Sequence, residues 1–145
     1  MTIFEQLRAG VATSSGEEMR DLAAALAQAL SADTVLALHG DLGVGKTTFV
    51  QGLACGLGIV DPITSPTFTL YNLHRGPKWQ LAHLDAYRLG SPAQLDALML
   101  EDFLISPYCL AVEWPEHVAA WLPPGTLHLD LSIAANGTHP IRLRS

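Results

Sequence analysis

The residues most able to do chemistry lie together in one stretch, Gly40-Asp41-Leu42-Gly43-Val44-Gly45-Lys46-Thr47. It matches G-x-x-x-x-G-K-[ST], the Walker A phosphate-binding loop. The glycines let the backbone turn tightly, so that successive N–H groups point inward at phosphate oxygens. Lys46 would add positive charge beside the β- and γ-phosphates, and the Thr47 hydroxyl would bind Mg²⁺. The nucleotide-binding residues that we predict are Gly43, Val44, Gly45, Lys46, Thr47 and Thr48.

The segments on either side decide whether this match is meaningful, because the loop must connect a strand to a helix. Residues 34–39 form a short apolar run that is typical of a buried strand. From Lys46 to about Gly58 the apolar residues recur at helical spacing, and Gly58 can end the helix. The alternative is a glycine-rich turn that fits the pattern by accident. With both flanks present, we interpret the stretch as a nucleotide site.

Two carboxylates are candidates for the metal and for the attacking water. Asp85 follows the strand-like run 78–84, and Glu113 follows the more continuous run 108–112. The apolar pattern favours Glu113, because Gln80 and His83 interrupt the run before Asp85. One carboxylate could orient Mg²⁺ while the other polarises water. Each could also be an ordinary solvated residue at the end of a strand.

A loop containing Thr64-Ser65-Pro66-Thr67-Phe68 follows the predicted P-loop helix. Two prolines, Pro62 and Pro66, stop the helix and favour an extended chain. Switch loops of P-loop proteins occupy this position, where a threonine hydroxyl can approach Mg²⁺ or the γ-phosphate. The alternative is a simple turn.

The remaining pattern predicts further helices and strands around this centre. A first strand or extended arm is expected over Ile3 to Val11, and a capping box from Ser15 to Glu18 starts a helix that runs to about Leu30. The other expected elements are a hairpin of 67–74 with 78–84, helices over 91–104 and 116–122, and a final hairpin around Asn136-Gly137. Together they predict one domain, residues 1–145. Its expected fold class is α/β, a P-loop NTPase domain with a central, mostly parallel sheet, added antiparallel strands and helices on both faces.

Composition and charge narrow the function. The net charge is −6, and Lys46 and Lys78 are the only lysines, so the chain cannot present a large basic face to nucleic acid. If its biology involves RNA, a partner should hold the RNA. No apolar run reaches the length of a membrane span, and we expect a cytoplasmic protein that does not bind membranes. Cys55 and Cys109 are expected to be buried small hydrophobic residues.

Four motifs that occur here in order resemble those of the bacterial TsaE family, small P-loop ATPases needed to make threonylcarbamoyladenosine in tRNA. The resemblance runs from about Thr13 to the C-terminal hairpin. The motifs are Gly40-Asp41-Leu42-Gly43-x-Gly-Lys-Thr-Thr, Thr64-Ser65-Pro66-Thr67-Phe68, His83-x-Asp85-x-Tyr87-Arg88 and Glu113-Trp114. One departure is His39, where this family commonly has tyrosine.

The resemblance implies a site that binds ATP and Mg²⁺, with the phosphates on the P-loop and Lys46. It associates Mg²⁺ with Thr47, Asp85 and Glu113, and it places Thr13 and Ser14 near the nucleotide base. It also implies that the chain works with the TsaB and TsaD proteins, and that tRNA is held by their complex and not by this chain alone. ATP hydrolysis would support turnover of that complex, so hydrolysis should be slow in the isolated chain.

Several alternatives remain open from the residues. A small GTPase would need an N-K-x-D motif, and neither Asn72 nor Asn136 is followed by lysine. A small-molecule kinase would usually add an arginine-bearing lid, and no such insertion is visible. A nucleotide-gated binding module would use ATP to order residues 64–68 without needing hydrolysis. The sequence also leaves open whether Arg88 approaches the phosphates, and whether Trp114 contacts the nucleotide or the core.

Overall fold

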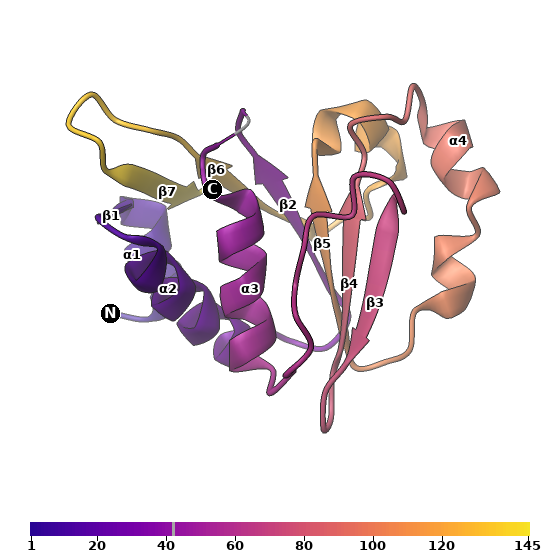
Figure 1. The fold of residues 1–145 in the computed structure, drawn as a ribbon, viewed down its shortest axis with the longest axis horizontal. Coiled ribbons are helices and arrows are strands. Elements are labelled where there is room, and N and C mark those ends of the chain that lie inside the picture. Colours follow the sequence, from indigo (N-terminus) through magenta and orange to yellow (C-terminus); the bar gives the residue numbers. More distant parts are fainter. Residues whose placement is uncertain (42) are drawn as a thin grey trace.

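A seven-stranded sheet organises the chain in a computed structural model, which describes residues 1–41 and 43–145 (Figure 1). Leu42, inside the predicted phosphate-binding loop, lies outside the described residues. The strand order is β1-β7-β6-β2-β5-β4-β3. The strands are β1 (Val11–Thr13), β2 (Thr34–His39), β3 (Tyr71–Arg75), β4 (Gln80–Asp85), β5 (Tyr108–Glu113), β6 (Leu127–Leu131) and β7 (His139–Leu143).

The central strands β6, β2, β5 and β4 pair in parallel, and β1, β7 and β3 join the edges by antiparallel pairing. This confirms the predicted mostly parallel sheet with antiparallel additions. The two predicted hairpins are present, as β3–β4 and as β6–β7, and Asn136-Gly137 lies in the turn of the second.

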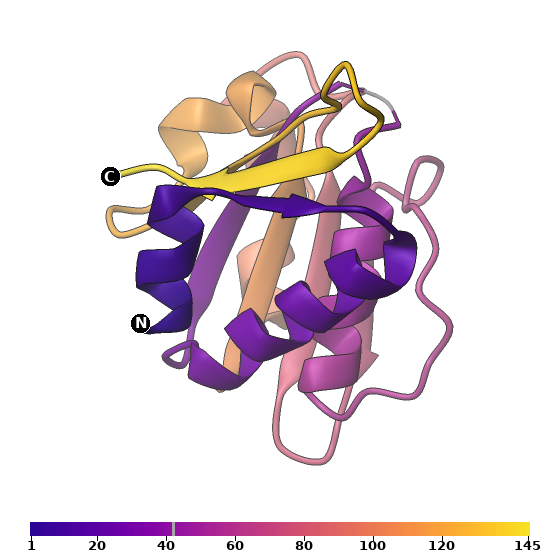
Figure 2. The same cartoon turned by 90° about the vertical axis from the view of Figure 1, so that its left-hand side faces the viewer.

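Helices cover both faces of the sheet, as predicted (Figures 1 and 2). On one face lie α1 (Ile3–Ala9), α2 (Gly16–Ala29) and α3 (Lys46–Gly56); on the other lie α4 (Pro92–Ala97) and the 3₁₀ helices η1 (Leu100–Phe103) and η2 (Pro115–Trp121). Side chains alternate between the faces, because successive strand residues point to opposite sides. In β5, Cys109 and Ala111 pack with the α2–α3 core, whereas Leu110 and Val112 pack with the core under α4.

Helices α2 and α3 pack with their backbones in close approach, through two glycines of α3. A Cβ atom on Gly52 would lie 2.4 Å from the Arg20 carbonyl oxygen, and one on Gly56 would lie 2.6 Å from the Ala24 carbonyl oxygen. Neither position has room for a larger residue while the helices keep this spacing. This packing sets where the N-terminal ends of α2 and α3 lie relative to each other.

The N-terminus of α2 has the predicted cap. The Glu18 backbone N–H donates to Ser15 Oγ at 3.1 Å, and the Ser14 N–H donates to Glu18 Oε2 at 3.0 Å. In a strict capping box the Glu18 side chain would accept from the N–H of the cap residue Ser15, whereas here it accepts from the N–H of Ser14. Two backbone donors at the start of the helix are still satisfied.

The prediction of a strand or extended arm over Ile3 to Val11 is wrong, since Ile3–Ala9 form helix α1. Thr2 caps this helix by accepting a hydrogen bond from the Glu5 N–H at 3.1 Å. Ile3, Phe4 and fully buried Leu7 pack on the main core at helical spacing. The helix ends at Gly10, whose φ of 95° turns the chain into β1.

Other boundaries differ where the backbone takes a positive φ. The first hairpin strand starts at Tyr71 and not at residue 67, because Leu70 has a φ of 71°. The helix predicted over 91–104 is split into α4 and η1 at Met99, which has a φ of 55°. The short helix predicted over 116–122 is the 3₁₀ helix Pro115–Trp121.

The two cysteines differ in burial. Cys109 is buried as predicted, but Cys55 is exposed, because it lies on the side of α3 that faces away from the sheet and α2. Across residues 1–41 and 43–145, no helix combines the length and the apolar character needed to cross a membrane.

Candidate functional site

The candidate site lies where three parallel strands end side by side. The register pairs Leu38 of β2 with Glu113 of β5, and Glu113 with Asp85 of β4. The chain leaves β2 at His39 and enters α3 at Lys46, so the predicted P-loop lies at this same edge. Carboxyl ends of parallel strands are where open α/β sheets bind ligands.

One pocket, which we call the P-loop pocket, has a volume of about 370 Å³ and brings most of the predicted residues together. It contains the P-loop, both candidate carboxylates and two hydroxyls of the predicted switch loop. Its lining residues are Gly43, Gly45, Lys46, Thr47, Thr48, Ser65, Thr67, Asp85, Glu113 and Trp114. Ser65 and Thr67 therefore bring the segment 64–68 to the site, and the predicted extended chain gives way to a turn at residues 67–69, where the Leu70 N–H donates to the Pro66 carbonyl oxygen at 2.8 Å.

A second pocket of about 260 Å³, the adjoining pocket, shares Gly43, Gly45 and Thr48 with the first. Thr13 and Ser14 line it, beside the loop as predicted for residues near a nucleotide base. The Thr13 hydroxyl is already used, since it donates to the His139 carbonyl oxygen at 3.0 Å. The remaining lining residues are Ser15, Gly16, Met19, Gly137 and His139.

Val44 lines neither pocket. Its side chain is buried in the main core, and its carbonyl oxygen lies 3.0 Å from His139 Nδ1. Its part in the site is to tie the loop to the C-terminal hairpin. Gly45 has a φ of 99° and begins α3 in a left-handed conformation that favours glycine, so the P-loop turns as the motif requires.

Lys46 is folded back into the loop. Its ammonium donates to the Gly40 carbonyl oxygen at 2.7 Å and lies 4.0 Å from the centre of the Trp114 ring. Burial lowers the pKa of Lys46, while the carboxylates of Glu113 and Asp85 act in the opposite direction. The lysine is thus the positive charge that faces both candidate carboxylates.

Trp114 has a φ of 55°, an uncommon conformation for a bulky residue. One part of its ring packs against the core under α4, and the ring also faces Lys46 and lies 5.1 Å from the Tyr87 ring. Because Trp114 lines the P-loop pocket as well, it is a core residue and a site residue at once.

The two carboxylates are both buried, at 7% exposure for Asp85 and 5% for Glu113. Asp85 Oδ1 accepts the Tyr87 backbone N–H at 2.9 Å, and Glu113 Oε2 lies 2.5 Å from His83 Nε2. The apolar pattern favoured Glu113 because Gln80 and His83 interrupt β4, but this reasoning is wrong. All six residues of β4 are buried, so its carboxylate is as well positioned as that of β5.

The donors present fit a bound Mg²⁺ ion. Among the described residues, no group of three or more His, Cys, Asp and Glu side chains is arranged as a metal cage. Mg²⁺ in nucleotide sites usually takes one or two carboxylates and completes its coordination with phosphate oxygens and water. Thr47, Asp85 and Glu113, which line one pocket, are the residues that would hold it.

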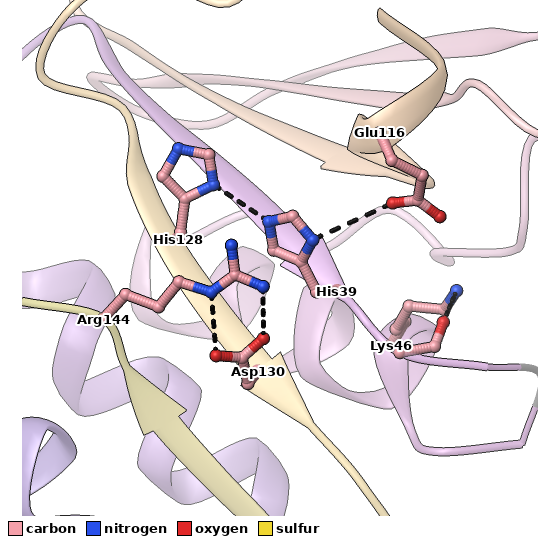
Figure 3. Close-up of polar contacts among 7 residues, drawn as sticks. His39, Lys46, Glu116, His128, Asp130 and Arg144 are labelled. Carbon is pink, nitrogen blue, oxygen red and sulfur yellow. Dashed lines mark hydrogen bonds and ion pairs between the residues drawn. The ribbon is translucent and has the colours of Figure 1, made fainter. Parts of the chain in front are cut away.

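A polar network lies beside the base of the P-loop, centred on His39 (Figure 3). His39 Nε2 lies 2.9 Å from His128 Nδ1, and His39 Nδ1 lies 3.8 Å from Glu116 Oε2. Arg144 donates two hydrogen bonds to Asp130, at 2.7 and 2.9 Å. Burial lowers the pKa of His39, and the nearby Arg144 guanidinium lowers it further.

Sequence reasoning missed three residues near the site, and besides Trp114 it left the role of Arg88 undecided. His139 and Gly137 reach the adjoining pocket from the far end of the chain, which no local pattern indicates. His83 was counted as an interruption, although it lies two residues before Asp85, a spacing that places both side chains on one side of β4. Arg88 does not line the P-loop pocket; its guanidinium lies 4.8 Å from the ring centre of exposed Phe68.

The parallel order of β6, β2, β5 and β4, the loop between β2 and α3, and the lysine and carboxylates at the strand ends define an α/β protein of the P-loop NTPase class. The family model described as threonylcarbamoyl adenosine biosynthesis protein TsaE matches residues 13–141. The chain belongs to the TsaE family.

Curated relatives named tRNA threonylcarbamoyladenosine biosynthesis protein TsaE agree with this. The protein of Treponema pallidum is 40% identical over 77% of this chain and 82% of its own length. That of Nostoc is 45% identical over 70% and 65%, and that of Rickettsia bellii is 34% identical over 90% of each chain. The crystal structure of Bacillus subtilis YdiB superposes with a TM-score of 0.75 at 34% identity, over 92% of this chain and 82% of YdiB.

Proposed function

We propose that this chain is a Mg²⁺-dependent ATPase required for threonylcarbamoyladenosine modification of tRNA next to the anticodon. The observation that carries the proposal is the P-loop pocket, in which Lys46, Thr47, Asp85 and Glu113 converge. These are the residue types that phosphoryl transfer to water needs: a phosphate-binding cation, metal ligands and a carboxylate that can orient water. The names of the relatives support the role in tRNA modification.

Each residue has a distinct role in this proposal. The backbone of 43–48 and the N-terminal end of α3 bind phosphate oxygens, and Lys46 balances their charge. Thr47 and Asp85 hold Mg²⁺, which neutralises charge that develops on the phosphates. Glu113 orients the attacking water or acts as a second metal-associated carboxylate. Glu113 Oε1 and the second oxygen of Asp85 are available for these roles, since no described protein group hydrogen-bonds to them.

The adjoining pocket is where we place the adenine and ribose. It continues from the P-loop through Gly43, Gly45 and Thr48, so a nucleotide whose phosphates lie on the loop can extend into it. Thr13 and Ser14 would then lie beside the base. Competition between ATP and GTP for binding tests this assignment against a GTPase.

The partners that we propose are the TsaB and TsaD proteins, with tRNA contacted through their complex in the cytoplasm. Hydrolysis would support turnover of that complex, and it should be slow without it. The acidic composition supports an indirect contact with tRNA, because the chain carries 14 acidic side chains against eight Lys and Arg.

The test is ATP turnover by the purified chain, alone and with TsaB, TsaD and tRNA. We expect the partners to stimulate the wild type, and Lys46→Ala and Glu113→Ala to lower kcat by about 100-fold or more, as loss of electrostatic or general-base groups does. Lys78→Ala is the matched control, because Lys78 is the one other lysine and lies exposed near the β3–β4 turn. Equal turnover with and without partners would contradict the proposed role in the complex.

A second candidate is a nucleotide-gated binding module. It is favoured by Ser65 and Thr67, which line the P-loop pocket from the loop 62–70, so a bound γ-phosphate could order that loop for docking. Glu113→Ala separates the two functions. If the variant complex still modifies tRNA over many cycles, nucleotide binding is sufficient; if it stops after one cycle, hydrolysis is required.

A further inference from the structure

A buried histidine beside the site is not used by the function proposed above. His83 lies in β4, and its side chain is fully buried. We infer that His83 is a positioning residue, which holds Glu113 Oε2 and so fixes how this carboxylate faces the P-loop pocket. The inference rests on the proposed ATPase function and names a residue through which Glu113 acts.

The register of the sheet explains why these two side chains meet. Leu81 of β4 and Cys109 and Ala111 of β5 pack with the α2–α3 core, so His83 and Glu113, two residues further on, point to that same face. His83 is paired with Ala111, whose small side chain leaves room for the imidazole. The ring can therefore extend towards Glu113, the next residue of β5 on that face.

The hydrogen bond is short and its direction is defined. His83 Nε2 lies 2.5 Å from Glu113 Oε2, and a carboxylate can only accept. The other ring nitrogen, Nδ1, is buried and has no partner among the described residues. A proton on Nδ1 would be a buried donor without an acceptor, which is costly, so the geometry favours the tautomer that carries its proton on Nε2.

This bond divides the two oxygens of Glu113. Oε2 is engaged by His83, while Oε1 accepts no hydrogen bond from any described residue and belongs to a side chain that lines the P-loop pocket. Partners of this kind orient carboxylates and metal ligands in many sites, and losing one costs about 10- to 100-fold in activity or metal affinity. A merely space-filling histidine would not show this division.

His74 in the neighbouring strand β3 is a matched control. Its partner in the register is Leu81, so it points to the same face as His83, and it too is buried with one unpartnered ring nitrogen. Its Nδ1 lies 3.6 Å from Asp61, away from the P-loop pocket. Replacing His74 reports the cost of losing a buried imidazole from this face without touching Glu113.

The experiment compares His83→Leu, His83→Gln and His74→Leu with wild type in the full chain, with TsaB, TsaD and tRNA present. For His83→Leu we expect kcat to fall about 10- to 100-fold, with KM and the Kd for ATP within about twofold of wild type. In His83→Gln, whose amide can donate from a similar position, most of kcat should return. His74→Leu should keep kcat within about twofold.

A second readout does not depend on turnover. In ¹⁵N-histidine-labelled protein, NMR should show His83 as the Nε2–H tautomer with a slowly exchanging proton, and Glu113→Ala should shift this signal and speed its exchange. An Nδ1–H tautomer, or a signal unchanged by Glu113→Ala, would overturn the inference.

The kinetic outcomes separate this inference from the proposed function. Absent turnover in the wild-type complex would contradict the ATPase function, and the NMR result would still decide whether His83 holds Glu113. Normal wild-type turnover that His83→Leu leaves unchanged would overturn the inference alone. Equal losses of kcat in His83→Leu and His74→Leu, or no recovery of kcat in folded His83→Gln, would show that His83 only fills space and would also overturn the inference.

Discussion

The buried charged residues at the P-loop depend on one another, because each compensates the charge of its neighbours. Lys46 is buried beside two buried carboxylates, Asp85 and Glu113. Burial lowers the pKa of the lysine, and the two carboxylates raise it in part. Removing one member of such a group leaves the others buried without compensation. The effect of Lys46→Ala on folding must therefore be measured beside its effect on turnover, because the variant leaves two buried carboxylates without the positive charge of the lysine.

His39 makes the stability of the protein depend on pH. Its pKa in the folded protein lies below the usual value of 6.5, first because of burial and then because of Arg144 and His128, with Asp130 and Glu116 opposing. As pH falls through 6.5, the unfolded chain binds more protons than the folded protein, so the free energy of unfolding falls. We expect His39→Gln to lose less stability than wild type between pH 7.5 and pH 5.5, measured by urea denaturation.

The difference between the two proteins at pH 8 is the control, since His39 is neutral there in both states and this difference gives the pH-independent cost of the substitution. Asp130 affects the free energy of unfolding only at lower pH. Its hydrogen bonds from Arg144 lower its pKa, so its contribution is lost only in acid and does not overlap with the tested range. Parallel stability curves from pH 8 to pH 5.5 would contradict the assignment to His39.

At the scale of elements, the contact between α2 and α3 positions both pockets. Gly52→Ala would place a Cβ atom 2.4 Å from the Arg20 carbonyl oxygen and 2.7 Å from the Ala23 Cβ. Alanine gains about 1 kcal/mol in helix propensity, but overpacking of a rigid contact typically costs about 1–3 kcal/mol. Because the clash is with backbone, we expect a net loss of about 1–2 kcal/mol in the free energy of unfolding.

Gly90→Ala is the control for this prediction. A Cβ atom there would meet the Gln94 side chain at 3.5 Å, an ordinary contact. Urea denaturation of both variants gives the comparison. The affinity for ATP should also fall in Gly52→Ala, since α2 and α3 would move apart beneath the adjoining pocket; an unchanged or increased stability would show that the helices can separate without cost.

The elements that sequence reasoning predicted well are those with a strong local signal. The Gly45-Lys46 start of α3, the cap at Ser15 and the Asn136-Gly137 turn each have a local sequence signal, and each is present. Helix α1 was missed because its signal is one cap residue and three apolar side chains in seven residues. Met99 splits the predicted helix and Leu70 delays the start of β3 through positive φ values, which residue type does not reveal.

Site residues that follow a single apolar strand could be predicted from the sequence. Contacts that depend on the register between strands could not. Asp85 and Glu113 follow apolar runs, and parallel strands bring their ends together. The His83–Glu113 contact and the position of His139 depend on how distant strands are aligned. One sequence contains no direct record of that alignment, so these contacts become visible only in three dimensions.

At the scale of the whole molecule, charge decides how the chain can meet tRNA. With a net charge of −6, the isolated chain should be repelled by the phosphate backbone. Proteins that bind nucleic acid non-specifically at physiological salt do so with Kd values of about 10⁻⁴–10⁻⁶ M, by means of basic faces that release counterions. We therefore expect the isolated chain to bind tRNA more weakly than about 100 μM, measured by fluorescence anisotropy at about 150 mM salt.

Addition of TsaB and TsaD supplies the positive control, and under the proposed function the labelled chain should then co-migrate with tRNA in an ATP-dependent manner. Micromolar binding by the isolated chain that weakens steeply with salt would contradict the indirect contact, because such a slope reports phosphate contacts made by the chain's own cations. Binding at that strength without a salt slope would instead indicate stacking contacts, for which exposed Phe68 and Tyr87 beside the P-loop pocket are the side chains to replace. The salt dependence therefore separates an indirect contact from either kind of direct one in a single titration.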